Sequence, residues 1–150
     1  MASMPAAPIP LLVRELHGDA RESACRLFAS VARKGLAVPI REARVFVIDD
    51  PAGDPGHIPA GAIALAAAPD RSAAQIICLA VDTSRRHLEV GVRLVASTAD
   101  RLRAEGIRQL AADLAQLEQS DDGTVARVLA ACGFGPDPQA ESSSRLVLDL

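Results

Sequence analysis

The sequence predicts a mixed β-sheet packed against helices in an α/β (α+β) domain. Helical and strand patterns alternate along the chain, and its 150 residues are enough for one domain with a real core. Three strand patterns follow one another between residues 43 and 81, which predicts an antiparallel meander. The last of them leads directly into a long amphipathic helix pattern. These observations together favour a layered sheet-and-helix domain.

The strand–turn–helix segment from Gln75 to Gly106 is the most informative part of the chain. Its apolar run Ile76–Val81 is typical of a strand buried on both faces, and a polar turn with two arginines follows at 82–86. The first N–H groups of a helix have no partner within the helix. The turn therefore predicts an anion site at the helix start. The expected core stripe of this helix consists of Leu88, Val92, Val95, Ala99 and Leu102.

The remaining elements are assigned by the same rules. Residues 1–10 are expected to form a disordered tail, since three prolines interrupt them. Gly61 indicates a bulge or a close backbone approach within its strand. The helix after residue 86 makes a crossover, so the strands before and after it should be parallel. Strands are expected at 11–16, 43–48, 58–67, 73–81, 108–114 and 145–150, helices at 19–35, 88–106 and 125–133, a polar connection at 116–123 and a turn at 134–138.

Composition argues against several functional classes. The net charge is −3 and no basic patch contains aromatic residues, so nothing indicates nucleic-acid binding. No apolar run reaches membrane-spanning length, and no basic region precedes the N-terminal apolar residues as in a secretory signal. Cys25, Cys78 and Cys132 are far apart within apolar patterns, which favours reduced core thiols over a disulfide or a metal site. We therefore expect a cytoplasmic protein without a bound metal.

Three segments resemble the GNAT superfamily of N-acetyltransferases. Arg86–Gly91 (RHLEVG) stands where this family has its pyrophosphate loop, and 74–81 matches the strand that leads into it. Residues 128–134 (VLAACGF) resemble the family's closing helix. The resemblance extends over about residues 11–150, as one domain. It implies a mostly antiparallel central sheet of six to seven strands flanked by helices.

The resemblance also implies a cosubstrate and a reaction. In this family an amine attacks the thioester of acetyl-CoA directly, in a ternary complex. The pantetheine arm pairs with the backbone of the fourth strand, and the diphosphate binds amides at the helix start. The acceptor would be an amine on a small molecule or a peptide, and a homodimer is possible. The implied binding residues are Leu79, Ala80, Val81, Arg86, His87, Leu88, Glu89, Val90, Gly91 and Val92.

Three positions depart from the family pattern. Glu89 replaces the first loop glycine, Leu129 replaces the usual Tyr in a chain without Tyr, and Gln75 replaces a Glu base found in some members. Asp82 and Asp113 lie near strand ends, where a turn or capping role is favoured over that of a base. No catalytic residue is therefore assigned. Two alternatives remain: a GNAT-fold ligand-binding or dimer-forming module with little or no turnover, and an unrelated α/β domain that binds another phosphate ligand.

Overall fold

The computed structural model describes residues 12–17, 43–49, 61–67, 72–81, 87–117, 124–139 and 145–150. These residues form a seven-stranded sheet in the order β1-β2-β3-β4-β5-β7-β6. All neighbouring strands are antiparallel except β4 and β5, which are parallel. The predicted mostly antiparallel sheet and its parallel crossover are thus confirmed. The strands are β1 Leu12–Leu16, β2 Arg44–Asp49, β3 Gly61–Ala67, β4 Ala73–Val81, β5 Gln109–Asp113, β6 Gly135–Pro136 and β7 Arg145–Asp149; the helices are α2 His87–Ala104, α3 Leu114–Leu117 and α4 Thr124–Ala131.

Two short elements differ from the sequence prediction. A polar connection was expected from residue 116, but Leu114–Leu117 forms α3, whose Leu117 is buried in the core. A turn was expected at 134–138, but Gly135–Pro136 forms the edge strand β6 beside β7. Proline is tolerated there because an edge strand needs no hydrogen-bond donor on its outer side. The expected tail at 1–10 and helix at 19–35 lie outside the described residues.

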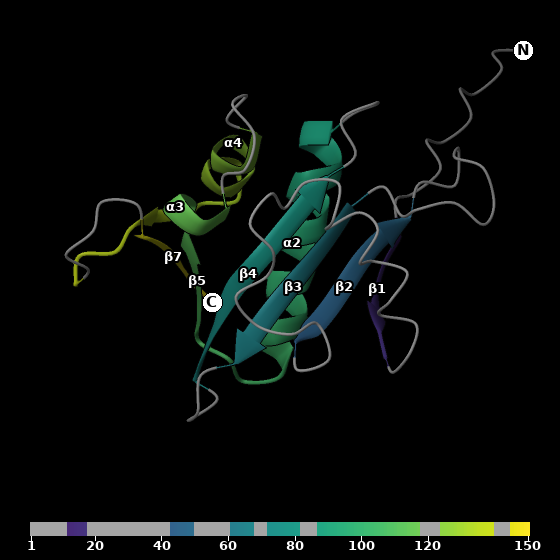
Figure 1. Ribbon diagram of the computed structural model, residues 1–150. Coiled ribbons are helices and arrows are strands. Elements are labelled where there is room, and N and C mark those ends of the chain that lie inside the picture. Colours follow the sequence, from purple (N-terminus) through teal and green to yellow (C-terminus); the bar gives the residue numbers. More distant parts are fainter. Residues whose placement is uncertain are drawn as a thin grey trace, which may run out of the picture.

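The sheet buries a different set of side chains on each face. One face carries the larger core and packs against α2 and α4, with Ile63, Ile76 and Leu110 from the strands and Leu94 and Leu129 from the helices. Figure 1 shows α2 running along this face. The opposite face has a second cluster built largely of small strand residues: Ala62, Ala64, Cys78 and Ala80, together with Leu16, Ala43, Val45 and Val47.

The buried side of α2 is wider than the predicted stripe. Val95, Ala99 and Leu102 are buried as expected, and Val92 is half-buried. Val90, Leu94 and Thr98 are also buried, although the stripe did not include them. Thr98 is tolerated in this position because its Oγ1 donates a hydrogen bond to the Leu94 carbonyl, at 2.7 Å.

The helices α2 and α4 are each followed by the glycine that the sequence predicted as their stop. Gly106 and Gly133 have φ values of 88° and 98°, a conformation that side chains disfavour. Beyond them, the Ile107 amide bonds to the Leu102 carbonyl at 3.0 Å, and the Phe134 amide bonds to the Leu129 carbonyl at 3.1 Å. These six-to-one bonds define Schellman motifs, which satisfy the last carbonyls of each helix.

Candidate functional site

β4 changes its environment halfway along its length. From Ala73 to Ile76 it pairs with β5 on one side, and from Ala74 to Val81 it pairs with β3 on the other. The last β4–β5 pair is Ile76 with Ala112, so no described strand pairs with Ile77–Val81 on the β5 side. Figure 1 shows the two strands meeting at one end and diverging toward the other, where α3 and α4 lie. We call this divergence the split.

A β-bulge marks the start of the split. Ala64 pairs with Cys78 and Leu65 pairs with Ile76, so Ile77 is an extra residue in β4. Ile76 packs in the core cluster under α2, whereas Cys78 belongs to the cluster on the opposite face and the partly buried Ile77 packs against that cluster. A bulge bends its strand and increases the local twist. It therefore gives a physical reason for β4 to leave β5 at this residue.

The N-terminal turn of α2 lies close to the end of β4. Gly61 pairs with Val81, the last residue of β4. A Cβ atom on Gly61 would stand 3.1 Å from Ile48 Cγ2, 3.2 Å from Val90 Cγ1 and 3.3 Å from Leu94 Cδ2. The close approach at Gly61 is made by side chains of β2 and α2, and the bulge lies at Ile77 instead. The missing side chain lets Val90 and Leu94 of α2 pack directly over the first residue of β3, which pairs with the end of β4.

The implied binding residues divide between the strand end and the helix start. Leu79 and Ala80 are buried on opposite faces of β4, and Val81 ends the strand. His87 and Leu88 begin α2, while Arg86 and Asp82 lie outside the described residues. The remaining four residues continue α2 from its first turn: Glu89 is exposed, Val90 and Gly91 are buried and Val92 is half-buried.

Glu89 lies at the positive end of the helix dipole. Its Oε1 is 3.8 Å from Nε of Arg93, one turn further along α2, and both side chains are exposed. A carboxylate in the first turn stabilises a helix, but it also occupies the end that favours other anions. The charge of Glu89 therefore opposes an anionic ligand at this helix start, and Arg93 offsets only part of it.

The structure also places the two other residues that depart from the family pattern, Leu129 and Gln75. Leu129 is fully buried in the core cluster, so the place of the usual Tyr is occupied by a packed aliphatic side chain. Gln75 pairs with Ala66 on β3 and Ala111 on β5, within the closed part of the sheet. Neither residue supplies an acid or a base at the split, because a leucine has no ionisable group and an amide does not accept a proton near neutral pH.

Cys78 and Cys132, the two cysteines among the described residues, are free thiols packed in or against the hydrophobic clusters, as the sequence predicts. Burial raises the pKa of the Cys78 thiol to about 12 and also raises the pKa of Cys132. The Cys132 thiol donates to the Val92 carbonyl at 3.6 Å, which ties the end of α4 to α2. Since a thiol is nucleophilic only as thiolate, Cys78 is a core residue at the edge of the site.

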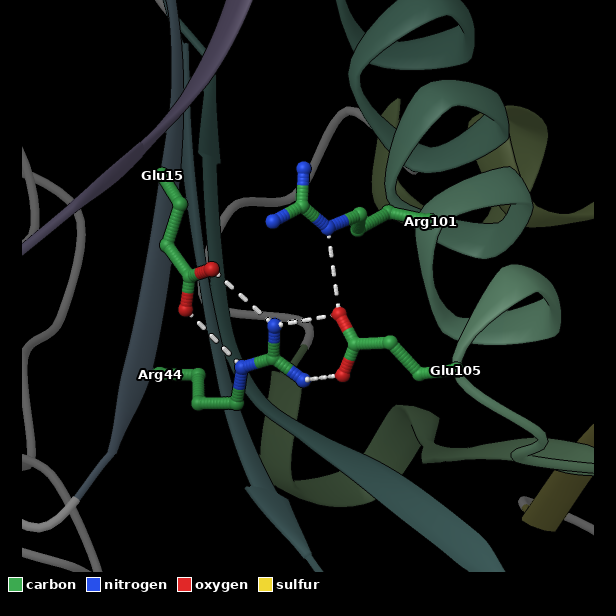
Figure 2. A network of polar contacts seen from close by, with 4 residues as sticks. All are labelled: Glu15, Arg44, Arg101 and Glu105. Carbon is green, nitrogen blue, oxygen red and sulfur yellow. Dashed lines mark hydrogen bonds and ion pairs between the residues drawn. The ribbon is translucent and has the colours of Figure 1, made fainter.

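An ion-pair network lies at the opposite end of α2 and was not predicted from the sequence (Figure 2). The Arg44 guanidinium donates to both oxygens of Glu15, at 2.9 and 3.0 Å, and to both oxygens of Glu105, at 2.7 and 2.9 Å. Arg101 Nε donates to Glu105 at 3.1 Å. These hydrogen bonds from Arg44 lower the pKa of Glu15 and of Glu105. We call these four residues the Arg44 network; it joins β1, β2 and α2.

The described residues give no sign of a metal centre or a membrane span. No group of three or more His, Cys, Asp or Glu side chains in the described ranges could hold a metal ion. In the same part of the chain, no helix is both long and apolar enough to cross a membrane.

Several solved structures resemble this one over nearly the whole chain. No protein-family model and no curated protein matches the sequence. An IAA acetyltransferase from Bacillus cereus superposes with a TM-score of 0.67 at 13% identity, over 94% of this chain and all of the other. A ribosomal-protein-S18-alanine N-acetyltransferase from Escherichia coli superposes with a TM-score of 0.63 at 13% identity, over 94% and 93% of the two chains.

A third resemblance involves a larger protein. N-acetylglutamate synthase from Neisseria gonorrhoeae, solved with coenzyme A and N-acetyl-glutamate, superposes with a TM-score of 0.67 at 20% identity. This chain is covered over 97% of its length but spans only 36% of the synthase chain. With the split sheet and these likenesses, the protein has the GNAT fold, that of the acyl-CoA N-acyltransferases.

Proposed function

We propose that this protein is an acyltransferase that transfers an acetyl group from acetyl-CoA to an amine. The observation that carries the proposal is the edge of β4 from Ile77 to Val81, which no described strand pairs with on the β5 side and which lies next to the N-terminus of α2. A strand edge presents N–H and C=O groups from alternate residues. Such an edge suits a pantetheine arm, which carries two amide groups of its own.

The helix start suits the other half of the same ligand. The first amides of α2 and the helix dipole favour negative charge, and Gly61 holds this turn next to the end of β4. We infer that the diphosphate of coenzyme A binds the segment 86–91 and that its arm follows Leu79, Ala80 and Val81. The acetyl group would then lie at the split. Two structural neighbours named as acetyltransferases, and a neighbour named as N-acetylglutamate synthase that was solved with coenzyme A, support this assignment.

The chemistry requires little from the protein beyond positioning and proton transfer. The amine nitrogen attacks the thioester carbonyl, the C–S bond breaks and the thiol is released. Backbone donors on β4 can polarise the carbonyl. Binding both substrates side by side makes the attack effectively unimolecular. The acceptor is an amine on a small molecule or a peptide end.

A second function deserves a test because of Glu89. A carboxylate at the helix start, the loss of the usual Tyr at Leu129 and an amide at Gln75 together favour a GNAT-fold module that binds a coenzyme A ligand with little turnover. Both functions need the same binding site. They differ only in whether bound acetyl-CoA reacts.

Calorimetric titration separates these functions from an unrelated domain. We expect acetyl-CoA and coenzyme A to bind. The nucleotide half of coenzyme A lacks the pantetheine arm, and its affinity should be lower than that of coenzyme A by about tenfold or more. Equal affinity for the whole and the half ligand would show that the β4 edge is not used. Failure of both to bind would overturn the proposal. Release of free thiol in the presence of a primary amine then distinguishes an enzyme from a binding module.

A further inference from the structure

The first residue of β5 beyond the last β4–β5 pair is an aspartate. The pairing ends at Ile76 and Ala112, and Asp113 follows as the last residue of β5. On the other strand, the next residue is the bulged Ile77. The Asp113 side chain is half-buried. Asp113 and Ile77 are therefore the residues that follow the last β4–β5 pair, one on each strand.

The side chain of Asp113 lies on the face of the sheet opposite α2. Leu110 and Ala112 of β5 belong to the core cluster under α2. Because side chains alternate between faces along a strand, Asp113 points to the other face. Cys78 belongs to the cluster on that same face, and Ile77 packs against it. The carboxylate and the bulge thus border the split from one side of the sheet.

Few other ionisable groups border the split within the described residues. The free part of β4 has only Cys78, whose buried thiol stays protonated at neutral pH, and α3 has no ionisable side chain. On β7, Arg145 is the Cα partner of Asp113, and its Nε bonds to Asp137 beside β6 at 3.0 Å. Asp113 also interacts with other groups of the protein. It is the one described carboxylate that ends a strand at the split.

We propose that Asp113 binds the amine acceptor and takes its proton, and that the acceptor reaches the split from the face opposite α2. This rests on the proposed acyl transfer. The amine nitrogen forms a bond to the thioester carbon, the C–S bond breaks, and the electron pair of that bond leaves with sulfur. The proton lost by nitrogen goes to the Asp113 carboxylate, from which it reaches the released thiolate or solvent.

The test compares Asp113→Asn with Asp149→Asn. Asp149 is the matched control, since it is an aspartate on the same face that pairs with Gln109 at the closed end of β5. We expect both variants to bind coenzyme A as the unsubstituted protein does. In Asp113→Asn alone, alaninamide, benzylamine or putrescine should bind the coenzyme A complex about tenfold more weakly by calorimetry. The turnover rate should fall about 10²–10⁴-fold, and its pH profile should lose the rise in rate that accompanies deprotonation of the base.

The outcomes distinguish a failure of the role of Asp113 from a failure of the proposed acyl transfer on which it rests. If the unsubstituted protein does not bind coenzyme A, the proposed function itself is wrong. If it binds coenzyme A but Asp113→Asn keeps its amine affinity, rate and pH profile, only the role of Asp113 is wrong. Loss of coenzyme A binding in Asp113→Asn would indicate a purely structural residue, and the absence of turnover with every amine would also overturn a catalytic role.

Discussion

The two ends of α2 are fixed to the sheet in opposite ways. At its C-terminal end, the Arg44 network joins the helix to β1 and β2 through paired charges. At its N-terminal end, apolar side chains pack onto Gly61 of β3, and the neighbouring strand β4 has an edge that no described strand covers. Polar groups at the first end are satisfied by one another. At the second end, the edge of β4 and the first turn of α2 have backbone N–H and C=O groups that form no hydrogen bond within their own strand or helix.

This difference separates residues that hold the fold from residues that are available to a ligand. The guanidinium of Arg44 is bound by two carboxylates and also lies 5.3 Å from the centre of the Phe46 ring. A group with this many partners inside the protein is poorly placed to bind anything else. The end with the split should therefore control ligand affinity, and the end with the Arg44 network should control stability.

Arg44→Met should produce the largest change, and it should affect stability alone. The substitution removes four hydrogen bonds and leaves Glu15 and Glu105 without their shared cation. We expect the free energy of unfolding to fall by about 2–3 kcal/mol, below the loss for a fully buried pair because these side chains are partly exposed. Urea denaturation measures the change. Coenzyme A affinity should stay within about twofold, and a larger loss would show that the two ends of α2 are coupled.

Gly61→Ala should come next, with effects on both stability and binding. The added Cβ would lie 3.1 Å from Ile48 Cγ2, 3.2 Å from Val90 Cγ1 and 3.3 Å from Leu94 Cδ2, so these side chains, two of them on α2, must shift by a few tenths of an ångström. Overpacking of this kind costs about 1–2 kcal/mol. Moving the first turn of α2 should also weaken coenzyme A binding severalfold, measured by calorimetry.

A second substitution provides the control for Gly61→Ala. Val90→Ala removes the Cγ1 atom that the new methyl group would approach. The double variant should therefore bind coenzyme A better than Gly61→Ala alone, and its loss of stability should be smaller than the sum of the two single losses. Strictly additive losses would show that the close contact does not position the helix.

The pH dependence of stability should distinguish the Arg44 network from the rest of the molecule. Arg44 lowers the pKa of Glu15 and of Glu105 below their ordinary value of 4.5. A group whose folded pKa is lowered stabilises the protein above its unfolded pKa, and this contribution is lost as the pH falls through the folded pKa. The difference in unfolding free energy between the unsubstituted protein and Arg44→Met should thus be full at about pH 6 and shrink toward about pH 3. A constant difference would mean that Arg44 acts through packing.

The sequence predicts β4 and α2 well, because their signals are local. The bounds of β4 at Ala73 and Val81 agree with the prediction, and Gly106 ends the helix segment as expected. The bulge at Ile77 could not be predicted in the same way. It shows itself as a break in the alternation of buried side chains, and a continuous apolar run has no alternation to break.

The Arg44 network was missed for a different reason. Its partners are separated by 29 and 61 residues, so no spacing rule connects them. Asp113 is an intermediate case. The sequence places it near a strand end, but only the β4–β5 register shows that it follows the last pair, and only the burial pattern shows on which face it lies. Long-range pairing therefore decides which of several plausible carboxylates becomes a candidate base.

Glu89→Gln should produce the smallest change and act on binding alone. It removes a negative charge from the start of α2 and keeps the size and hydrogen-bonding capacity of the side chain. Since Glu89 is exposed and partly compensated by Arg93, we expect coenzyme A affinity to rise only about two- to fourfold. Asp100→Asn is the matched control, because Asp100 is an exposed residue far along α2 that pairs with Arg103 at 3.4 Å. An equal gain in both variants would indicate a general effect of net charge, whereas a gain in Glu89→Gln alone would locate the ligand's phosphates at the first turn of α2.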